Sequence, residues 1–159
     1  MPYSQKYCLV SFISPANIST EFDTADWPLH VTLADVFATD RAGTTIEAKL
    51  AEMLAAQPPV ATVAGKETTL GTTSVVLLDK NKALLELHDH LITLLEANGA
   101  VFNAPEFTRE GFLPHCTVQR TGRLQNGDRL KIDTIALVDM FPDNNWQRRK
   151  VISIFKLWR

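Results

Sequence analysis

Two short segments of this chain share one pattern of residues. His30-Val31-Thr32-Leu33 and His115-Cys116-Thr117-Val118 each place a histidine, an apolar residue, a threonine and a second apolar residue in series. Alternation of this kind is typical of a half-buried β-strand, in which residues i and i+2 share one face. Each histidine closely follows a proline, Pro28 or Pro114. The pattern therefore predicts two half-buried strands, each with a histidine and a threonine on one face and apolar residues directed into a core.

An imidazole and a hydroxyl delivered twice on strand faces suit phosphoryl chemistry. One histidine can accept a proton, the other can donate one, and threonine hydroxyls can bind phosphate oxygens. A single His-x-Thr arises often by chance, and threonine is favoured in strands for its shape alone. The duplication within 159 residues is what favours a site. We predict that His30 and His115 are catalytic and that Thr32 and Thr117 bind substrate.

Around these motifs the chain resembles the two-histidine phosphoesterase superfamily, in its branch of bacterial 2′-5′ RNA ligase-like and cyclic phosphodiesterase proteins. The resemblance is carried by Trp-Pro-Leu-His-Val-Thr-Leu at 27–33 and by Gly-Phe-Leu-Pro-His-Cys-Thr-Val at 111–118. It implies two similar halves that each give one motif to a shared cleft. It also implies opening of 2′,3′-cyclic phosphates, often to a 2′-phosphate, with 2′-5′ RNA ligation as the reverse reaction. Cys116 stands where such proteins more often carry an aliphatic residue.

Hydrophobic periodicity predicts an α+β fold. Strands are expected at 7–13, 30–37, 60–70, 74–78, 116–119, 130–140 and 151–158, helices at 44–57 and 82–98, and a loop at 14–27. Each half then runs strand, helix, strands, with a His-x-Thr strand inside. We expect a single bilobal domain over residues 1–159, made of two pseudo-symmetric lobes of antiparallel sheet that face each other across a cleft, with the helices on the outside.

Three other candidates have structural explanations. Cys116 lies beside His115, but adjacent strand residues point to opposite faces, which argues against a cysteine–histidine nucleophile pair. His88 and His90 are two residues apart on a predicted helix, about 200° around its axis, so they cannot share a metal ion. His88 falls on the leucine-rich face, and we expect both histidines to be structural. No cysteine or histidine cluster has the spacing of metal ligands, and neither a metal nor a cofactor is expected.

The residues after the second motif leave two possibilities open. Strand parity directs Gln119 with His115 and Thr117 and directs Arg120 away from them. A bulge or the end of the strand at this point would change the face to which each side chain points. Either Gln119 or Arg120 could therefore bind a phosphate.

Composition limits the partners. The formal net charge is −2 and the pI about 6.1, whereas a protein that coats nucleic acid carries a basic surplus. A nucleotide or an RNA terminus bearing a phosphate is the expected partner, with no membrane and no obligate protein partner. Two cysteines do not make a disulfide framework, and no secretory signal is evident. We expect a cytoplasmic monomer.

Three functions remain in view. The first is a metal-independent phosphodiesterase of 2′,3′-cyclic phosphates. The second is a non-catalytic module that holds a nucleotide or RNA end, and the third is a purely structural domain. Turnover of a cyclic nucleotide in the presence of a chelator separates the first from the others. RNA ends, ADP-ribose cyclic phosphate and 2′-5′ oligoadenylate all stay open as substrates, and the sequence does not say which histidine is the base.

Overall fold

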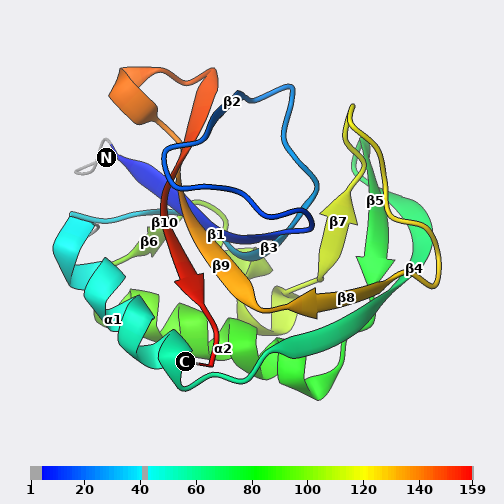
Figure 1. Ribbon diagram of the computed structural model, residues 1–159, viewed down its shortest axis with the longest axis horizontal. Coiled ribbons are helices and arrows are strands. Elements are labelled where there is room, and N and C mark those ends of the chain that lie inside the picture. The colour runs from blue at the N-terminus through cyan, green and yellow to red at the C-terminus, as the bar shows by residue number, and fades with distance from the viewer. Residues whose placement is uncertain (1–4, 41–42, 159) are drawn as a thin grey trace.

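An antiparallel network of strands backed by two helices makes up the computed structural model, which describes residues 5–40 and 43–158 (Figure 1). Within those residues the strands are β1 (Lys6–Phe12), β2 (Glu21–Asp23), β3 (His30–Ala38), β4 (Val60–Leu70), β5 (Thr73–Leu78), β6 (Val101–Phe102), β7 (His115–Thr117), β8 (Arg129–Ile132), β9 (Thr134–Asp139) and β10 (Arg148–Lys156). The helices are α1 (Gly43–Ala55) and α2 (Lys82–Ala97), with 3-10 turns η1 (Pro105–Phe107), η2 (Arg109–Gly111) and η3 (Pro142–Asn144). The predicted α+β class is confirmed.

Helix α2 forms where capping and periodicity agree. The Asn81 side chain accepts a hydrogen bond from the Leu84 backbone N–H at 2.9 Å, which caps the first turn. Gly99 follows the helix with a φ of 83°, a conformation that favours glycine at this position. The buried positions recur at helical spacing and form one apolar face: Leu84, Leu87, His88, Leu91, Ile92 and Leu95. None of the described helices is long and apolar enough to cross a bilayer.

The two halves of the chain join at the strands that carry the motifs. The strand order is β2-β10-β9-β1-β3-β7-β5-β4-β8, with β6 also paired to β3. Strands β3 and β7 are antiparallel neighbours, and Val31 lies opposite Cys116. The structure thus adds to the predicted bilobal arrangement a direct hydrogen-bonded junction between the first-half strand β3 and the second-half strand β7.

The segment predicted as one strand at 130–140 is two strands. β8 pairs with β4, whereas β9 pairs with β1 and β10. The break between them falls at Asp133, because there the chain leaves one half of the network and enters the other. The alternation of Leu130 and Ile132 with polar residues ends at the polar pair Asp133-Thr134, and a run of four apolar residues follows at 135–138. The prediction of one strand joined these two patterns.

Two short strands were not predicted. β2 lies inside the segment expected to be a loop, and β6 follows helix α2. Strands of two or three residues exist through their partners. In β2, Asp23 lies opposite Arg148 and Glu21 opposite Lys150, and such cross-strand pairs of opposite charge are favourable.

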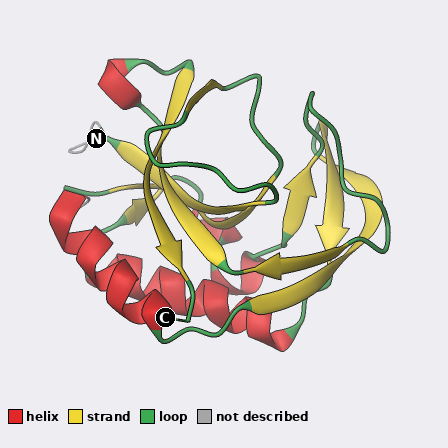
Figure 2. Cartoon of the chain, viewed as in Figure 1, coloured by secondary structure: helices red, strands yellow, loops and turns green. Residues whose placement is uncertain are grey.

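The network carries apolar side chains on both faces of its first half. The main core lies between the strands and the helices and includes Leu9, Leu33 and Leu50. A second cluster includes Val10 and Phe22, with Trp27 packed against it. Figure 2 shows both helices on one side of the strands, with the long loop around β2 on the other. This loop and the second cluster lie on the side to which His30 belongs.

Candidate active site

The register of β3 against β7 gathers the four predicted site residues. With Val31 opposite Cys116 in an antiparallel pair, His30 lies across from Thr117 and Thr32 across from His115. All four side chains therefore point to one face of the sheet. The two histidines are diagonal neighbours, a relation that separates residues by roughly 7–8 Å. Val31 and Cys116 point the other way and are buried in the main core.

Both histidines are held by the same local hydrogen bond. His30 Nδ1 lies 2.9 Å from the Pro28 carbonyl oxygen, and His115 Nδ1 lies 2.7 Å from the Leu113 carbonyl oxygen. A carbonyl can only accept, so Nδ1–H is the donor in each case. In the neutral ring Nε2 is then the acceptor, and in the charged ring it is a donor. The bond fixes each ring so that Nε2 can take up or release a proton.

The surroundings of His30 set its protonation. Its ring centroid lies 4.3 Å from that of Trp27 and 6.1 Å from that of Phe12. Burial among these rings lowers the pKa of His30 below its ordinary 6.5, against the opposing effect of the hydrogen bond to Pro28, and the charge of His115 lowers the pKa further. His30 is therefore neutral at neutral pH. Nothing in the sequence pattern pointed to Trp27 as its neighbour.

The polar atoms that could meet a ligand lie at Nε2 of each motif histidine and at the hydroxyl of each motif threonine. Among the described residues, no hydrogen bond engages Nε2 of His30 or His115, or the hydroxyls of Thr32 and Thr117. All four residues are partly exposed. This face of the β3–β7 junction thus presents two imidazole nitrogens and two hydroxyls to solvent.

Cys116 has no part in this surface. Its residue is 1% exposed, on the face opposite His115. Burial raises the pKa of the Cys116 thiol to about 11, and that of the buried Cys8 thiol to about 12. Both cysteines are free. A thiol that keeps its proton at neutral pH is a weak nucleophile, so the expected structural role of Cys116 agrees with its position.

The helical histidines differ from each other. His88 is 1% exposed and lies on the buried face of α2, as the leucine pattern predicted, whereas His90 is exposed. Within the described residues, no group of three or more His, Cys, Asp or Glu side chains is gathered so that it could hold a metal ion.

Arg120 lies beyond the part of the chain where strand parity applies. β7 ends at Thr117, and a bridge between Gln119 and Gly122 turns the chain back. The Arg120 guanidinium lies 3.4 Å from Asp26, four residues before His30. The ion pair therefore links the segments that flank the two motifs. Both side chains are at least half exposed, and such a pair contributes little to stability.

Acidification is expected to destabilise the fold through two histidines. Burial is the main cause that lowers the pKa of both His30 and His88 below 6.5. Between that lowered pKa and 6.5 the unfolded chain binds more protons than the folded one, so the free energy of unfolding falls as the pH is lowered. Urea unfolding from about pH 8 to about pH 5 measures this slope. His88→Asn should flatten it, whereas the exposed His90→Asn should leave it unchanged; equal slopes in all three proteins would contradict the assignment.

The features described so far place two histidines and two threonines on one face of an antiparallel α+β fold. The family model of the 2′-5′ RNA ligase superfamily matches residues 17–139, which include both motifs. The chain belongs to the 2′-5′ RNA ligase superfamily. No curated protein sequence matches it.

Solved structures show the same fold at low identity. The first is a crystal structure of a phosphoesterase whose sequence is 20% identical to this chain. Its TM-score is 0.58, and the alignment covers 98% of this chain and 99% of that one. E. coli LigT complexed with NADP+ is 16% identical, with a TM-score of 0.58 and 98% of each chain covered. The protein TT0787 of Thermus thermophilus is 13% identical, with a TM-score of 0.62, and the alignment covers 96% of this chain and 97% of that one.

Proposed function

We propose that this protein is a metal-independent phosphodiesterase that opens 2′,3′-cyclic phosphates at RNA ends or in nucleotides. The observation that carries the proposal is the register of Val31 against Cys116, because it puts two imidazoles and two hydroxyls on one face. Displacement at phosphorus needs a base on the attacking oxygen and an acid on the leaving oxygen. Two diagonal histidines, each with Nδ1 already engaged, supply that pair of groups at their Nε2 atoms.

We assign the base to His30 and the acid to His115. Burial lowers the pKa of His30, so its Nε2 is the one ready to accept a proton. In hydrolysis, Nε2 of His30 takes a proton from water as the water oxygen bonds to phosphorus. The bond from phosphorus to one ribose oxygen breaks, and that oxygen takes the proton from Nε2 of His115. Thr32 and Thr117 donate hydrogen bonds to the non-bridging oxygens. Departure of the 3′ oxygen leaves a 2′-phosphate.

The same steps permit ligation. If a 5′-hydroxyl of a second RNA end replaces water as the attacking group, departure of the 3′ oxygen leaves a 2′-5′ linkage. Nucleotide binding is supported by E. coli LigT, whose crystal structures include complexes with 3′-AMP and with ATP. The alternative is a binding module with the same fold. It would retain affinity for such nucleotides without turning any of them over.

Turnover of a 2′,3′-cyclic nucleotide in excess EDTA tests the proposal. We expect kcat/KM to rise and then fall with pH, since His30 must be neutral and His115 protonated. Because the pKa of His30 is lowered, the rising limb should lie below pH 6.5. Chromatography identifies the product as 2′- or 3′-phosphate. Activity that is lost in EDTA and restored by a divalent ion would indicate a metal-bound hydroxide instead, and binding without turnover would favour the binding module.

A further inference from the structure

We propose that His88, on helix α2, is a positioning residue that holds the two motif strands in their working relation. The inference rests on the proposed function. His88 lies outside the candidate site, yet it contacts both segments that carry the site. One contact is with the last residue of the first motif, on β3, and the other is with the loop before the second motif.

The first contact is with β3. His88 Nδ1 lies 2.6 Å from the Leu33 carbonyl oxygen, and Leu33 is the residue after Thr32. The strand is irregular at this point: Thr32 pairs with Val10 of β1 and Ala34 pairs with Leu9, so Leu33 has no partner of its own. Such a bulge bends a strand and leaves its extra residue unpaired. The His88 ring supplies the donor for the carbonyl of that residue.

The second contact is with the loop that leads to His115. The Arg109 backbone N–H donates to His88 Nε2 at 2.9 Å, and the Phe112 ring stacks on the His88 ring at 3.8 Å with an interplanar angle of 3°. Phe112 is buried and stands three residues before His115. With Nδ1–H donating and Nε2 accepting, both ring nitrogens are used, and the tautomer is fixed.

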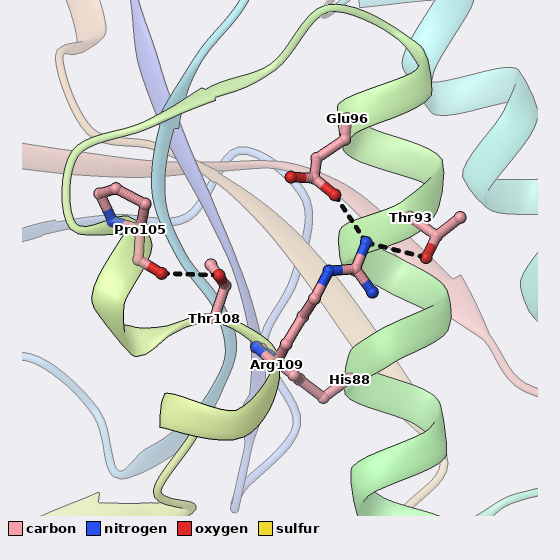
Figure 3. Close-up of polar contacts among 6 residues, drawn as sticks. All are labelled: His88, Thr93, Glu96, Pro105, Thr108 and Arg109. Carbon is pink, nitrogen blue, oxygen red and sulfur yellow. Dashed lines mark hydrogen bonds and ion pairs between the residues drawn. The ribbon is translucent and has the colours of Figure 1, made fainter.

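The loop itself is closely fitted against α2. Figure 3 shows the Arg109 side chain extending from the loop to Thr93 and Glu96 on the helix. Its guanidinium donates to the Thr93 hydroxyl at 3.2 Å and to the Glu96 carboxylate at 2.6 Å. These contacts are half exposed, so they stabilise the loop little. A Cβ on Gly111 would come within 1.8 Å of the Glu106 carbonyl oxygen, so this part of the loop allows no larger residue. The buried anchor of the loop is His88.

The His88 contacts therefore help to fix the position of His30 relative to His115. β7 pairs with β5 at all three of its residues, but it pairs with β3 only where Val31 lies opposite Cys116. The strand pairing between the two motifs therefore rests on a single residue pair. His88 adds a second connection between the two motif segments. It bonds to the Leu33 carbonyl of β3 and contacts Arg109 and Phe112 of the loop before β7. A displacement of about 1 Å in reacting groups can lower the rate about 10²-fold. Loss of the His88 contacts is therefore expected to lower kcat.

Three replacements separate the two bonds. An asparagine amide lies near the position of Nδ1 and can keep the donation to Leu33, whereas a glutamine carbonyl lies near Nε2 and can keep the acceptance from Arg109. His88→Phe keeps the ring and its stacking on Phe112 but loses both bonds. We expect His88→Phe to lower kcat on a 2′,3′-cyclic nucleotide about 10–100-fold with KM nearly unchanged. His88→Asn and His88→Gln should give smaller losses, and they serve if His88→Phe does not fold.

Leu95→Ala is the matched control, since Leu95 is fully buried on the same helix and touches neither motif segment through a hydrogen bond. It should lower the melting temperature yet keep the wild-type kcat well below that temperature. A wild-type kcat in all three His88 variants, or an equal fall of kcat in Leu95→Ala, would overturn the proposal.

A second measurement does not depend on activity. In NMR spectra the Nδ1–H and ring signals of His115 should shift or broaden in His88→Phe and stay in place in Leu95→Ala. If the wild-type protein turns over no phosphodiester, the proposed function fails but this spectrum still decides the inference. Unchanged His115 signals in folded His88→Phe would refute the positioning role even if the enzyme is active.

Discussion

Replacing either motif histidine by alanine is expected to lower kcat/KM on a 2′,3′-cyclic nucleotide by about 10²–10⁴-fold, the usual contribution of one general acid or base. His30→Ala removes the group that takes the proton from the attacking oxygen, and His115→Ala removes the group that protonates the leaving oxygen. Both residues are partly exposed, so neither truncation creates a large cavity, and both variants should fold.

His90→Ala is the control for this prediction, because His90 is an exposed histidine on α2 that makes no hydrogen bond, ion pair or ring contact with the described motif residues. It should retain wild-type turnover. Circular dichroism and thermal melting establish that each variant is folded. Wild-type turnover by either single variant, on every cyclic phosphate tried, would show that the reaction does not need a histidine pair.

Removing a motif hydroxyl should have the next largest effect. Thr32→Val and Thr117→Val keep the shape that a strand favours but delete one hydrogen bond to the phosphate. A hydrogen bond to a charged group contributes about 1.5–3 kcal/mol, which corresponds to a loss of roughly tenfold to a hundredfold in kcat/KM. Steady-state kinetics on the same substrate measures the loss.

Serine provides the matched comparison, since Thr32→Ser and Thr117→Ser keep the hydroxyl and lose only a methyl group. We expect the serine variants to stay near the wild-type rate. Serine variants as impaired as the valine variants would mean that the methyl packing matters and that the hydroxyls do not hold the phosphate.

Much of the fold could be predicted because local sequence patterns determine several of its helices and strands. The apolar spacing of α2 predicted a helix, and its ends follow from Asn81 and Gly99. The run from Val60 to Leu70 has the predicted bounds of β4. Strand alternation likewise placed Cys116 on the buried face. In each case the information lies within a few residues of the position concerned.

Other features depend on partners distant in the sequence, and the chain gives no local sign of them. The short strand β2 exists through its pairing with β10. The face to which the Arg120 side chain points could not be predicted. β7 ends at Thr117, and the alternation of faces applies only within the strand. The alternation predicted that a histidine and a threonine share a face within each motif, but the register of Val31 against Cys116 is a fact of tertiary pairing.

The leucine pattern around His88 correctly predicted a buried helical histidine. It could not predict the ring's hydrogen bonds, because Leu33 and Arg109 lie far away along the chain. The apolar stripe therefore predicted where His88 lies, but not that its hydrogen bonds connect the two motif segments.

The most direct test of the central claim is the rate of the double variant His30→Ala/His115→Ala. If both imidazoles act on one phosphorus atom, each single variant already disables the unit, and losses within such a unit are far from additive. We predict that kcat/KM of the double variant is close to that of the more impaired single variant. A loss equal to the product of the two single losses would show that the histidines act independently, and it would contradict a shared acid–base reaction at the β3–β7 junction.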